Sequence, residues 1–143
     1  MKSVLKRMSV DTARDVELID ISDHVLKAVA ESGVSQGIVY VTTMHTTSGV
    51  TVNEGLPDVE DDLLDLLART APEIGDYRHQ RFLPSDGQMA VNSSSHQRSL
   101  LTGMQVCFPI EGGKLVRGSR QTIYFAEFDG PLHRDYVIHV IGI

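Results

Sequence analysis

Short runs of β-branched and aromatic residues, separated by turns, follow one another from residue 105 to the end of this 143-residue chain. Gly112–Gly113 and Gly130–Pro131 stand between such runs, and both dipeptides are typical of tight turns. Strands that follow one another through tight turns pair antiparallel, so this pattern favours an α+β fold over a doubly wound parallel sheet. The strands expected in this segment are 105–110, 114–116, 121–128 and 136–141.

The first half adds further strands and the first of the expected helices. A helix is expected over 24–32, with Ser22 as its N-cap and Gly33 as its stop. Strand-like composition covers 3–10, 16–21, 37–43 and 50–53.

Two more helices are expected further along the chain. Pro57 stands where a second helix starts, and the acidic residues after it complement the helix dipole. Asn92 or Ser93 can cap a third helix, which Gly103 ends. The loop expected over 71–87 is long, and such loops are often functional. The second helix is expected to pack into the core through Val59, Leu63, Leu64, Leu66 and Leu67.

Nothing in the sequence divides the chain, which holds no internal repeat, low-complexity tract or linker. We therefore expect one compact domain over residues 1–143, built on a sandwich-like antiparallel β-sheet with about three helices. The single cysteine, Cys107, excludes an internal disulfide and fits a reducing compartment, and its apolar strand predicts a buried thiol. No apolar run approaches the ~20 residues of a membrane helix, and the N-terminus lacks the apolar core of a signal peptide. A cytoplasmic protein is expected.

The distribution of charge argues against nucleic acid as a partner. The net charge is −6, whereas a nucleic-acid binder needs a basic face. Residues 1–71 carry 6 basic and 12 acidic side chains, whereas residues 72–143 carry 7 of each. The second half therefore has room for an anion site, such as one for phosphate, in an otherwise acidic protein.

Three histidines stand in polar settings that suggest a site. His45 lies among five hydroxyl residues of 42–48 at the end of an expected strand, where hydroxyls such as those of Thr46, Thr47 and Ser48 can orient a phosphate. A polar loop with a surface histidine is an equal alternative. His96 lies in a serine-rich helix start that favours anions, and Arg98 can add a bidentate contact; an ordinary serine-rich cap explains the same residues.

His79 lies in the long loop and by itself is better interpreted as a solvated residue. The three histidines have no short metal-ligand spacing, so a three-histidine site would have to be assembled by folding. Among the carboxylates, Glu54 ends an expected strand, and Glu127 stands between two aromatic residues. If buried, Glu127 is a candidate base or metal ligand. Patterns for a P-loop, a dinucleotide fold, a nucleophile elbow and a paired-cysteine zinc module are absent from the sequence.

As an ordered set, these motifs resemble the YjbQ family, which is also named secondary thiamine-phosphate synthases. The resemblance runs over nearly the whole chain, although no single piece of it is specific. It is carried by His45–Ser48, Thr51–Glu54, Pro57–Val59, Tyr77–His79, Asn92–His96, Gly112–Leu115, Gln121 and Glu127–Pro131.

The resemblance implies an α+β domain that packs as a homotrimer, with a histidine-lined pocket at or near a subunit interface. The family's site histidines fall on His45, His79 and His96, which would hold a divalent metal (Zn²⁺ or Mg²⁺) or a phosphate-like anion. Its acidic residues fall on Glu54 and Glu127. The implied activity is thiamine-phosphate synthesis, in which a pyrimidine carried on pyrophosphate is joined to a thiazole phosphate and pyrophosphate is released.

The sequence departs from the family pattern at the family's tryptophan, where Arg120 stands, and after Pro131, where the family's arginine is displaced to Arg134. Two hypotheses follow. In the first, the protein is an enzyme for phosphorylated small molecules, a synthase or a metal-assisted hydrolase, in which Arg98, Arg120 and Arg134 neutralise phosphate charge. In the second, it is a non-catalytic trimeric module that binds a metal or a phosphorylated metabolite.

Overall fold

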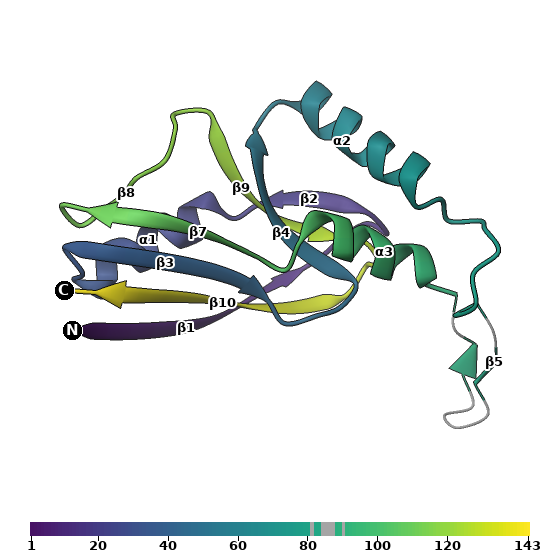
Figure 1. Ribbon diagram of the computed structural model, residues 1–143, viewed down its shortest axis with the longest axis horizontal. Helices are drawn as coiled ribbons and strands as arrows, with labels where there is room; N and C mark the ends of the chain where they lie inside the picture. Colours follow the sequence, from purple (N-terminus) through teal and green to yellow (C-terminus); the bar gives the residue numbers. More distant parts are fainter. Residues whose placement is uncertain (81, 84–87, 90) are drawn as a thin grey trace.

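Two antiparallel sheets form the body of the protein in the computed structural model, which describes residues 1–80, 82–83, 88–89 and 91–143 (Figure 1). The larger sheet has five strands in the order β1-β10-β3-β7-β8. Its continuous antiparallel pairing confirms the α+β class predicted from the turns. These strands are β1 (Lys2–Asp11), β10 (His133–Gly142), β3 (Gln36–Thr43), β7 (Gln105–Glu111) and β8 (Lys114–Leu115).

The smaller sheet has three strands in the order β2-β9-β4. They are β2 (Glu17–Asp20), β9 (Gln121–Glu127) and β4 (Ser48–Glu54), and β9 is the central strand that pairs with both neighbours. Two short strands, β5 (Phe82–Leu83) and β6 (Gln88–Met89), pair within the expected long loop. Residues 81 and 84–87 of that loop lie outside the described part of the chain.

One hydrophobic core joins the two sheets and helix α1 (Ser22–Ser32). Val39 and Ile138 from the larger sheet, Phe125 from the smaller sheet and Val25 from α1 all belong to it and are fully buried. Helix α1 ends at Gly33, which has φ 65°, as a left-handed C-cap does. The core therefore fixes the relative positions of the two sheets, and with them the loops at their ends.

The predicted N-cap of α1 is wrong. Ser22 is the first residue of the helix, and its hydroxyl accepts a hydrogen bond from Ile123 N, 2.9 Å away, in β9. The backbone N–H of Ser22 instead donates to the carboxylate of Asp20 at 2.9 Å. The serine hydroxyl that the local sequence predicts as a helix cap therefore makes a tertiary hydrogen bond with β9 instead.

Helix α2 (Pro57–Thr70) begins at the predicted proline, but the predicted core contact is wrong. None of its residues is buried, and Leu66 is 51% exposed. Figure 1 shows α2 at the side of the molecule, away from the larger sheet. Tyr124 donates a 2.6 Å hydrogen bond to Glu60 and ties the helix to β9. Its leucine face is only partly covered by this chain, since Leu63, Leu64 and Leu67 are half-buried.

Helix α3 (Ser93–Thr102) packs beside β4 and begins after Asn92, as predicted. Asn92 caps it through the backbone, because its side-chain amide donates to Asp129 at 2.7 Å instead. Cys107 differs from the expected buried thiol, since it lies exposed on the outer face of β7. No helix in the described part of the chain is long and apolar enough to span a membrane.

Candidate functional site

The loop between β3 and β4 carries His45, and buried hydroxyl groups build it. The Thr43 and Ser48 hydroxyls lie 2.6 Å apart and close the base of the loop. Thr43 Oγ1 also accepts a hydrogen bond from His45 N at 3.3 Å, and Ser48 O accepts one from Ser99 Oγ of α3 at 2.6 Å. Two of the hydroxyl residues around His45 therefore shape the loop and hold it against α3.

A buried ion pair lies beneath this loop. Arg134 donates from Nε to Glu127 at 2.7 Å and from Nη2 to Thr47 Oγ1 at 2.8 Å. Arg134 is 4% exposed and Glu127 is 0% exposed. Because the guanidinium bonds the carboxylate and the loop at once, it positions Thr47 and, through it, the residues on either side.

Glu127 is fully engaged by its neighbours. Besides Arg134, it accepts hydrogen bonds from Thr12 Oγ1 and from the backbone N–H groups of Phe128 and Asp129, each at 2.9 Å. Burial by itself raises the pKa of this carboxyl, but the hydrogen bonds from Arg134, Asp129 and Thr12 lower the pKa on balance. Glu127 is therefore an ionised group that supports the loop from below.

His45 is held as a neutral imidazole. Its Nε2 accepts a 2.8 Å hydrogen bond from the backbone N–H of Asp135. Burial is the largest effect that lowers the pKa of His45, and the positive charge of Arg134 lowers it further. A hydrogen bond accepted at Nε2 requires that nitrogen to be unprotonated, so the ring proton sits on Nδ1.

His96 and His79 lie together on the other side of the loop. Their rings meet edge to face with centroids 5.2 Å apart. His96 Nδ1 lies 3.1 Å from the carbonyl oxygen of Thr46, and since a carbonyl only accepts, Nδ1 carries the proton. A carbonyl bonded to Nδ1 orients Nε2 away from the loop, an arrangement common for metal-binding histidines. In the part of the chain that the structure describes, no three His, Cys, Asp or Glu side chains converge in a group that could hold a metal.

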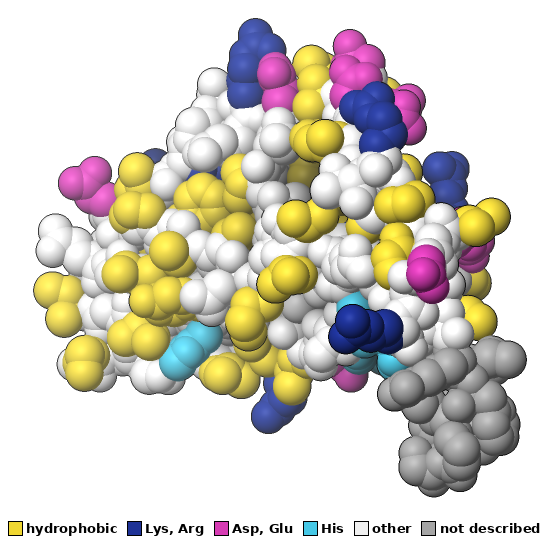
Figure 2. Space-filling view, turned by 45° about the vertical axis from the view of Figure 1, so that its right-hand side comes forward, with side chains coloured by type: hydrophobic (Ala, Val, Ile, Leu, Met, Phe, Trp, Pro, Cys, Tyr) yellow, Lys and Arg dark blue, Asp and Glu magenta, His cyan; other side chains and the backbone are white. Residues whose placement is uncertain are grey.

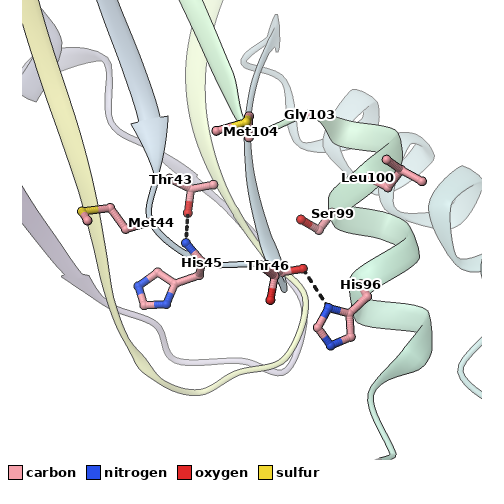
Figure 3. A pocket seen from close by; sticks show the side chains of 9 residues that line it. All are labelled: Thr43, Met44, His45, Thr46, His96, Ser99, Leu100, Gly103 and Met104. Carbon is pink, nitrogen blue, oxygen red and sulfur yellow. Dashed lines mark hydrogen bonds between the residues drawn. The ribbon is translucent and has the colours of Figure 1, made fainter. Parts of the chain in front are cut away.

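An open cavity of about 720 Å³ lies between the loop and α3 (Figure 3). Thr46 lies between the imidazoles of His45 and His96 in this view. The volume falls within the range of small-molecule sites. The cavity is lined by Thr43, Met44, His45, Thr46, His96, Ser99, Leu100, Gly103 and Met104.

Arg98 lies on the opposite face of α3 from this cavity. Its side chain is buried, and Nε donates to the carbonyl oxygen of Ala71 at 3.0 Å. It lines a second, smaller cavity of about 220 Å³ together with Glu73, Ser94 and Asp129. Within one chain, Arg98 and His96 therefore face different spaces.

Glu54 and Arg120 pair with each other at the far end of β4. Glu54 lies six residues along the strand from Ser48, which corresponds to about 20 Å. The Arg120 side chain is 80% exposed. The fold therefore brings together His45, Thr46, His79 and His96 over Glu127 and Arg134, and it places Glu54 and Arg120 elsewhere on the same chain.

Sequence reasoning did not single out two backbone groups that orient the site. They are the N–H of Asp135 and the carbonyl of Thr46, each bonded to a histidine. Every residue has such groups, so no residue type signals their role. Only the pairing of β10 with β3, which places Tyr136 opposite Thr43, brings Asp135 to His45.

Known proteins that are similar to this chain over nearly its whole length belong to one family. The family model described as "UPF0047 protein YjbQ-like" matches residues 6–143. A UPF0047 protein of Methanocaldococcus jannaschii is 34% identical over 140 residues, covering 97% of this chain and 95% of that protein. The UPF0047 protein YugU of Bacillus subtilis is 34% identical over 140 residues, covering 97% and 100%.

Solved structures share the fold over almost their full length. A YjbQ-like protein of unknown function from Sulfolobus solfataricus superposes with a TM-score of 0.92 at 29% identity, covering 99% of both chains. An uncharacterised YjbQ/UPF0047 protein of Clostridium acetobutylicum superposes with a TM-score of 0.85 at 42% identity, covering 95% of this chain and 99% of that one.

Proposed function

The chain belongs to the UPF0047 YjbQ-like family, and on that premise we propose that it is a cytoplasmic enzyme that acts on phosphorylated small molecules. The first candidate is a reaction of the thiamine-phosphate synthase type. In it, a thiazole phosphate is joined to a pyrimidine as the pyrimidine's bond to pyrophosphate breaks, and pyrophosphate leaves with the electron pair. The family resemblance motivates this chemistry, and the cavity between the 44–47 loop and α3 is the proposed site.

The observation that carries the proposal is the presence of both imidazoles in one cavity above a buried cation. His45 and His96 line the cavity, and Arg134 lies close enough to lower the pKa of His45. Hydrogen-bond donors aimed at developing negative charge are the main means by which enzymes assist phosphate leaving groups. In this proposal, the N–H of His45 and the hydroxyl of Thr46 bind phosphate oxygens, while Arg134 and Glu127 keep the loop in place.

The proposal includes a divalent metal at one side of this cavity, for which the described residues of one chain supply two imidazoles and no third ligand. His96 has its Nδ1 bonded to a carbonyl, and His79 lies beside it, so these two rings would hold the ion. Imidazole ligands suit Zn²⁺ better than Mg²⁺. When bound, such an ion would neutralise charge on the departing pyrophosphate.

We propose further that three copies of the chain associate. Apolar side chains remain exposed on the outer face of the larger sheet, among them Leu5 at 51% and Ile38 at 42%. The leucine face of α2 is also only partly covered, with Leu66 exposed. Figure 2 shows hydrophobic side chains spread over a wide part of one side of the molecule, with charged side chains mainly toward its edges. Surfaces of this kind mark protein interfaces.

The test is an assay of thiamine-phosphate formation from the pyrimidine pyrophosphate and the thiazole phosphate, with pyrophosphate release measured in parallel. Turnover that falls at least about tenfold in His45→Ala, with the fold retained, would support the synthase. The matched control is His24→Ala, because His24 lies exposed on α1, bonded to Tyr136 and outside the cavity.

A second candidate, the non-catalytic binding module, is favoured by the state of Glu127. Every contact of this carboxylate is internal to the fold, so it offers no free base to a substrate. Binding of the thiazole phosphate without turnover would support the module, and release of phosphate from either substrate alone would support a hydrolase. If the protein shows no binding and no turnover, the proposed site is wrong.

A further inference from the structure

We propose that the smaller cavity beside α3, lined by Arg98 and Ser94, is a second binding site that takes a small α-amino acid. The carboxylate of the ligand lies against these two side chains at the bottom of the cavity, and its ammonium group faces the carboxylates at the rim. Neither His45 nor His96 lines this cavity, so the inference goes beyond the proposed reaction and does not depend on it.

The first observation is a buried guanidinium group without an anion beside it. Arg98 is 7% exposed, and its Nε donates to the carbonyl oxygen of Ala71 at 3.0 Å. The described residues give its two terminal nitrogens no hydrogen-bond acceptor and its charge no ion pair, whereas the buried Arg134 pairs with Glu127. A buried charge without a partner is costly. The terminal nitrogens therefore present a fork of donors that matches a carboxylate in the cavity.

The second observation is the start of α3, which belongs to the same wall of the cavity. Ser94 is 3% exposed, and its hydroxyl has no hydrogen-bond partner in the part of the chain that the structure describes. It is the second residue of the helix, where the backbone N–H groups lack partners within the helix and the dipole favours negative charge. The first turn contains no acidic residue. The hydroxyl and Arg98 therefore both point to an anionic group as the ligand.

Tertiary hydrogen bonds hold the walls of the cavity in place. Ser95, which follows Ser94, donates from Oγ to the carbonyl oxygen of Phe128 at 2.5 Å. On the opposite side, Gly130 N donates to the carbonyl oxygen of Asp15 at 3.0 Å. All five of these residues line the cavity, so the site is formed before a ligand arrives.

The rim of the cavity has the opposite charge. Asp15 and Glu73 are exposed, and Asp129 is half-buried. Three carboxylates and one guanidinium thus line the cavity, an excess of negative charge that repels a multiply charged anion such as phosphate. A ligand that carries an ammonium group beside its carboxylate meets both signs of charge. An α-amino acid has these two groups on one carbon atom.

The volume of the cavity limits the size of the ligand. It is about 220 Å³, below the ~300–1,000 Å³ of sites for drug-sized molecules. The apolar part of the lining comes from Val16, Val91 and Phe128. The ligand is therefore one of the amino acids with a short side chain, namely glycine, L-alanine, L-serine or L-threonine.

Isothermal titration calorimetry of the purified protein with these four amino acids tests the proposal, and at least one is expected to bind. Analogues of the tightest binder that lack one charged group test the need for both. For L-alanine these are propionate and ethylamine, and each should bind at least about tenfold more weakly than the amino acid. Binding of none of the four amino acids would overturn the proposal. So would equal binding of the carboxylate analogue, or tighter binding of inorganic phosphate.

Variants at the two ends of the cavity separate the roles of its charges. Ser94→Ala and Arg98→Lys should each lower the affinity for the amino acid at least about tenfold, because both remove donors to the carboxylate. Glu73→Gln should weaken the amino acid but strengthen its carboxylate analogue, since it removes negative charge from the rim. The matched control is Gln97→Ala, an exposed position of α3 outside the cavity, which should bind as the wild type does.

Thermal unfolding of each variant shows whether its fold is retained. If Arg98→Lys loses its fold with the hydrogen bond to Ala71, Ser94→Ala decides the outcome alone. Wild-type affinity in a folded Ser94→Ala protein would overturn the proposal. The amino acid should also bind His45→Ala as tightly as the wild type. Loss of binding in that variant would place the ligand in the larger cavity and contradict a second site, whatever the synthase assay shows.

Discussion

Glu127 and Arg134 show how a single buried pair supports a site that it does not line. The carboxylate and the guanidinium are both almost fully buried, and each is bonded to further groups of the fold. Removing one member of such a pair leaves the other charge buried without a partner. Loss of one member of the pair would also destabilise the 44–47 loop, because Arg134 donates a hydrogen bond to Thr47.

Replacing Glu127 by glutamine tests this role. Glu127→Gln keeps the size of the side chain but leaves the charge of Arg134 uncompensated, so the free energy of unfolding should fall by about 3–5 kcal/mol. Equilibrium unfolding in urea measures the change. Ligand binding at the cavity should weaken in parallel, because the loop loses its support.

Glu54→Gln is the matched control, since it makes the same chemical change in an ion pair on the surface. Its partner Arg120 is 80% exposed, and exposed pairs contribute little to stability. The unfolding transition of Glu54→Gln should stay close to that of the wild type. If the two variants lose stability equally, Glu127 does not have the structural role assigned to it.

At the scale of elements, the site depends on how closely α3 approaches β4. Val50 N donates to the carbonyl oxygen of Gly103 at 3.1 Å, and Ser99 donates to Ser48 at 2.6 Å. Gly49 lies between these contacts. A Cβ there would lie 2.7 Å from Thr102 Cγ2 and 2.8 Å from the Gly103 carbonyl oxygen. Only glycine therefore lets the strand that follows His45 meet the helix that carries His96.

Gly49→Ala should push α3 away from β4. Because one of the crowded atoms belongs to the backbone, the strain cannot be relieved by a side-chain rotation, and we expect a loss of about 1–3 kcal/mol. Thermal unfolding and pyrophosphate binding should both change. The control is Gly118→Ala, whose Cβ would meet only the Gln121 side chain, at 3.4 Å. Normal binding in a destabilised Gly49→Ala protein would show that the helix spacing does not set the site.

At the scale of the whole molecule, the exposed apolar surfaces are the basis of the proposed association. The outer side of β3 presents Ile38, whose neighbours across the sheet are Ile141 of β10 and Pro109 of β7. All three lie on the side away from the core. When a second copy covers a sheet face of this composition, burial of the apolar surface stabilises the association.

Light scattering on purified protein is expected to give the mass of a trimer. Ile38→Lys should convert it to smaller species, because a charge buried in an apolar interface is costly. Ser119→Lys, at an exposed turn, adds the same charge and should leave the mass unchanged. A monomeric wild-type protein, or a trimer unaffected by Ile38→Lys, would contradict the proposed association.

Local sequence determined most of the secondary structure. Turn residues and β-branched runs place the strands within a few residues of their observed bounds, and Pro57, Gly33 and Gly103 mark helix ends as predicted. These signals succeed because φ restrictions and capping act within a few residues. The ordered motifs also identified the family, since residue types at fixed positions are visible without coordinates.

The tertiary structure alone decided what the polar residues do. Glu127 became an internal support and Arg98 faced a second cavity, because strand register and helix rotation set which side each side chain takes. The leucines of α2 are only partly covered, because amphipathic spacing predicts which face of a helix is apolar but not which surface packs against it. The tautomers of His45 and His96 depend on one backbone N–H and one carbonyl that strand pairing and a loop deliver. Such groups are common to every residue, so their effect appears only when the chain is folded.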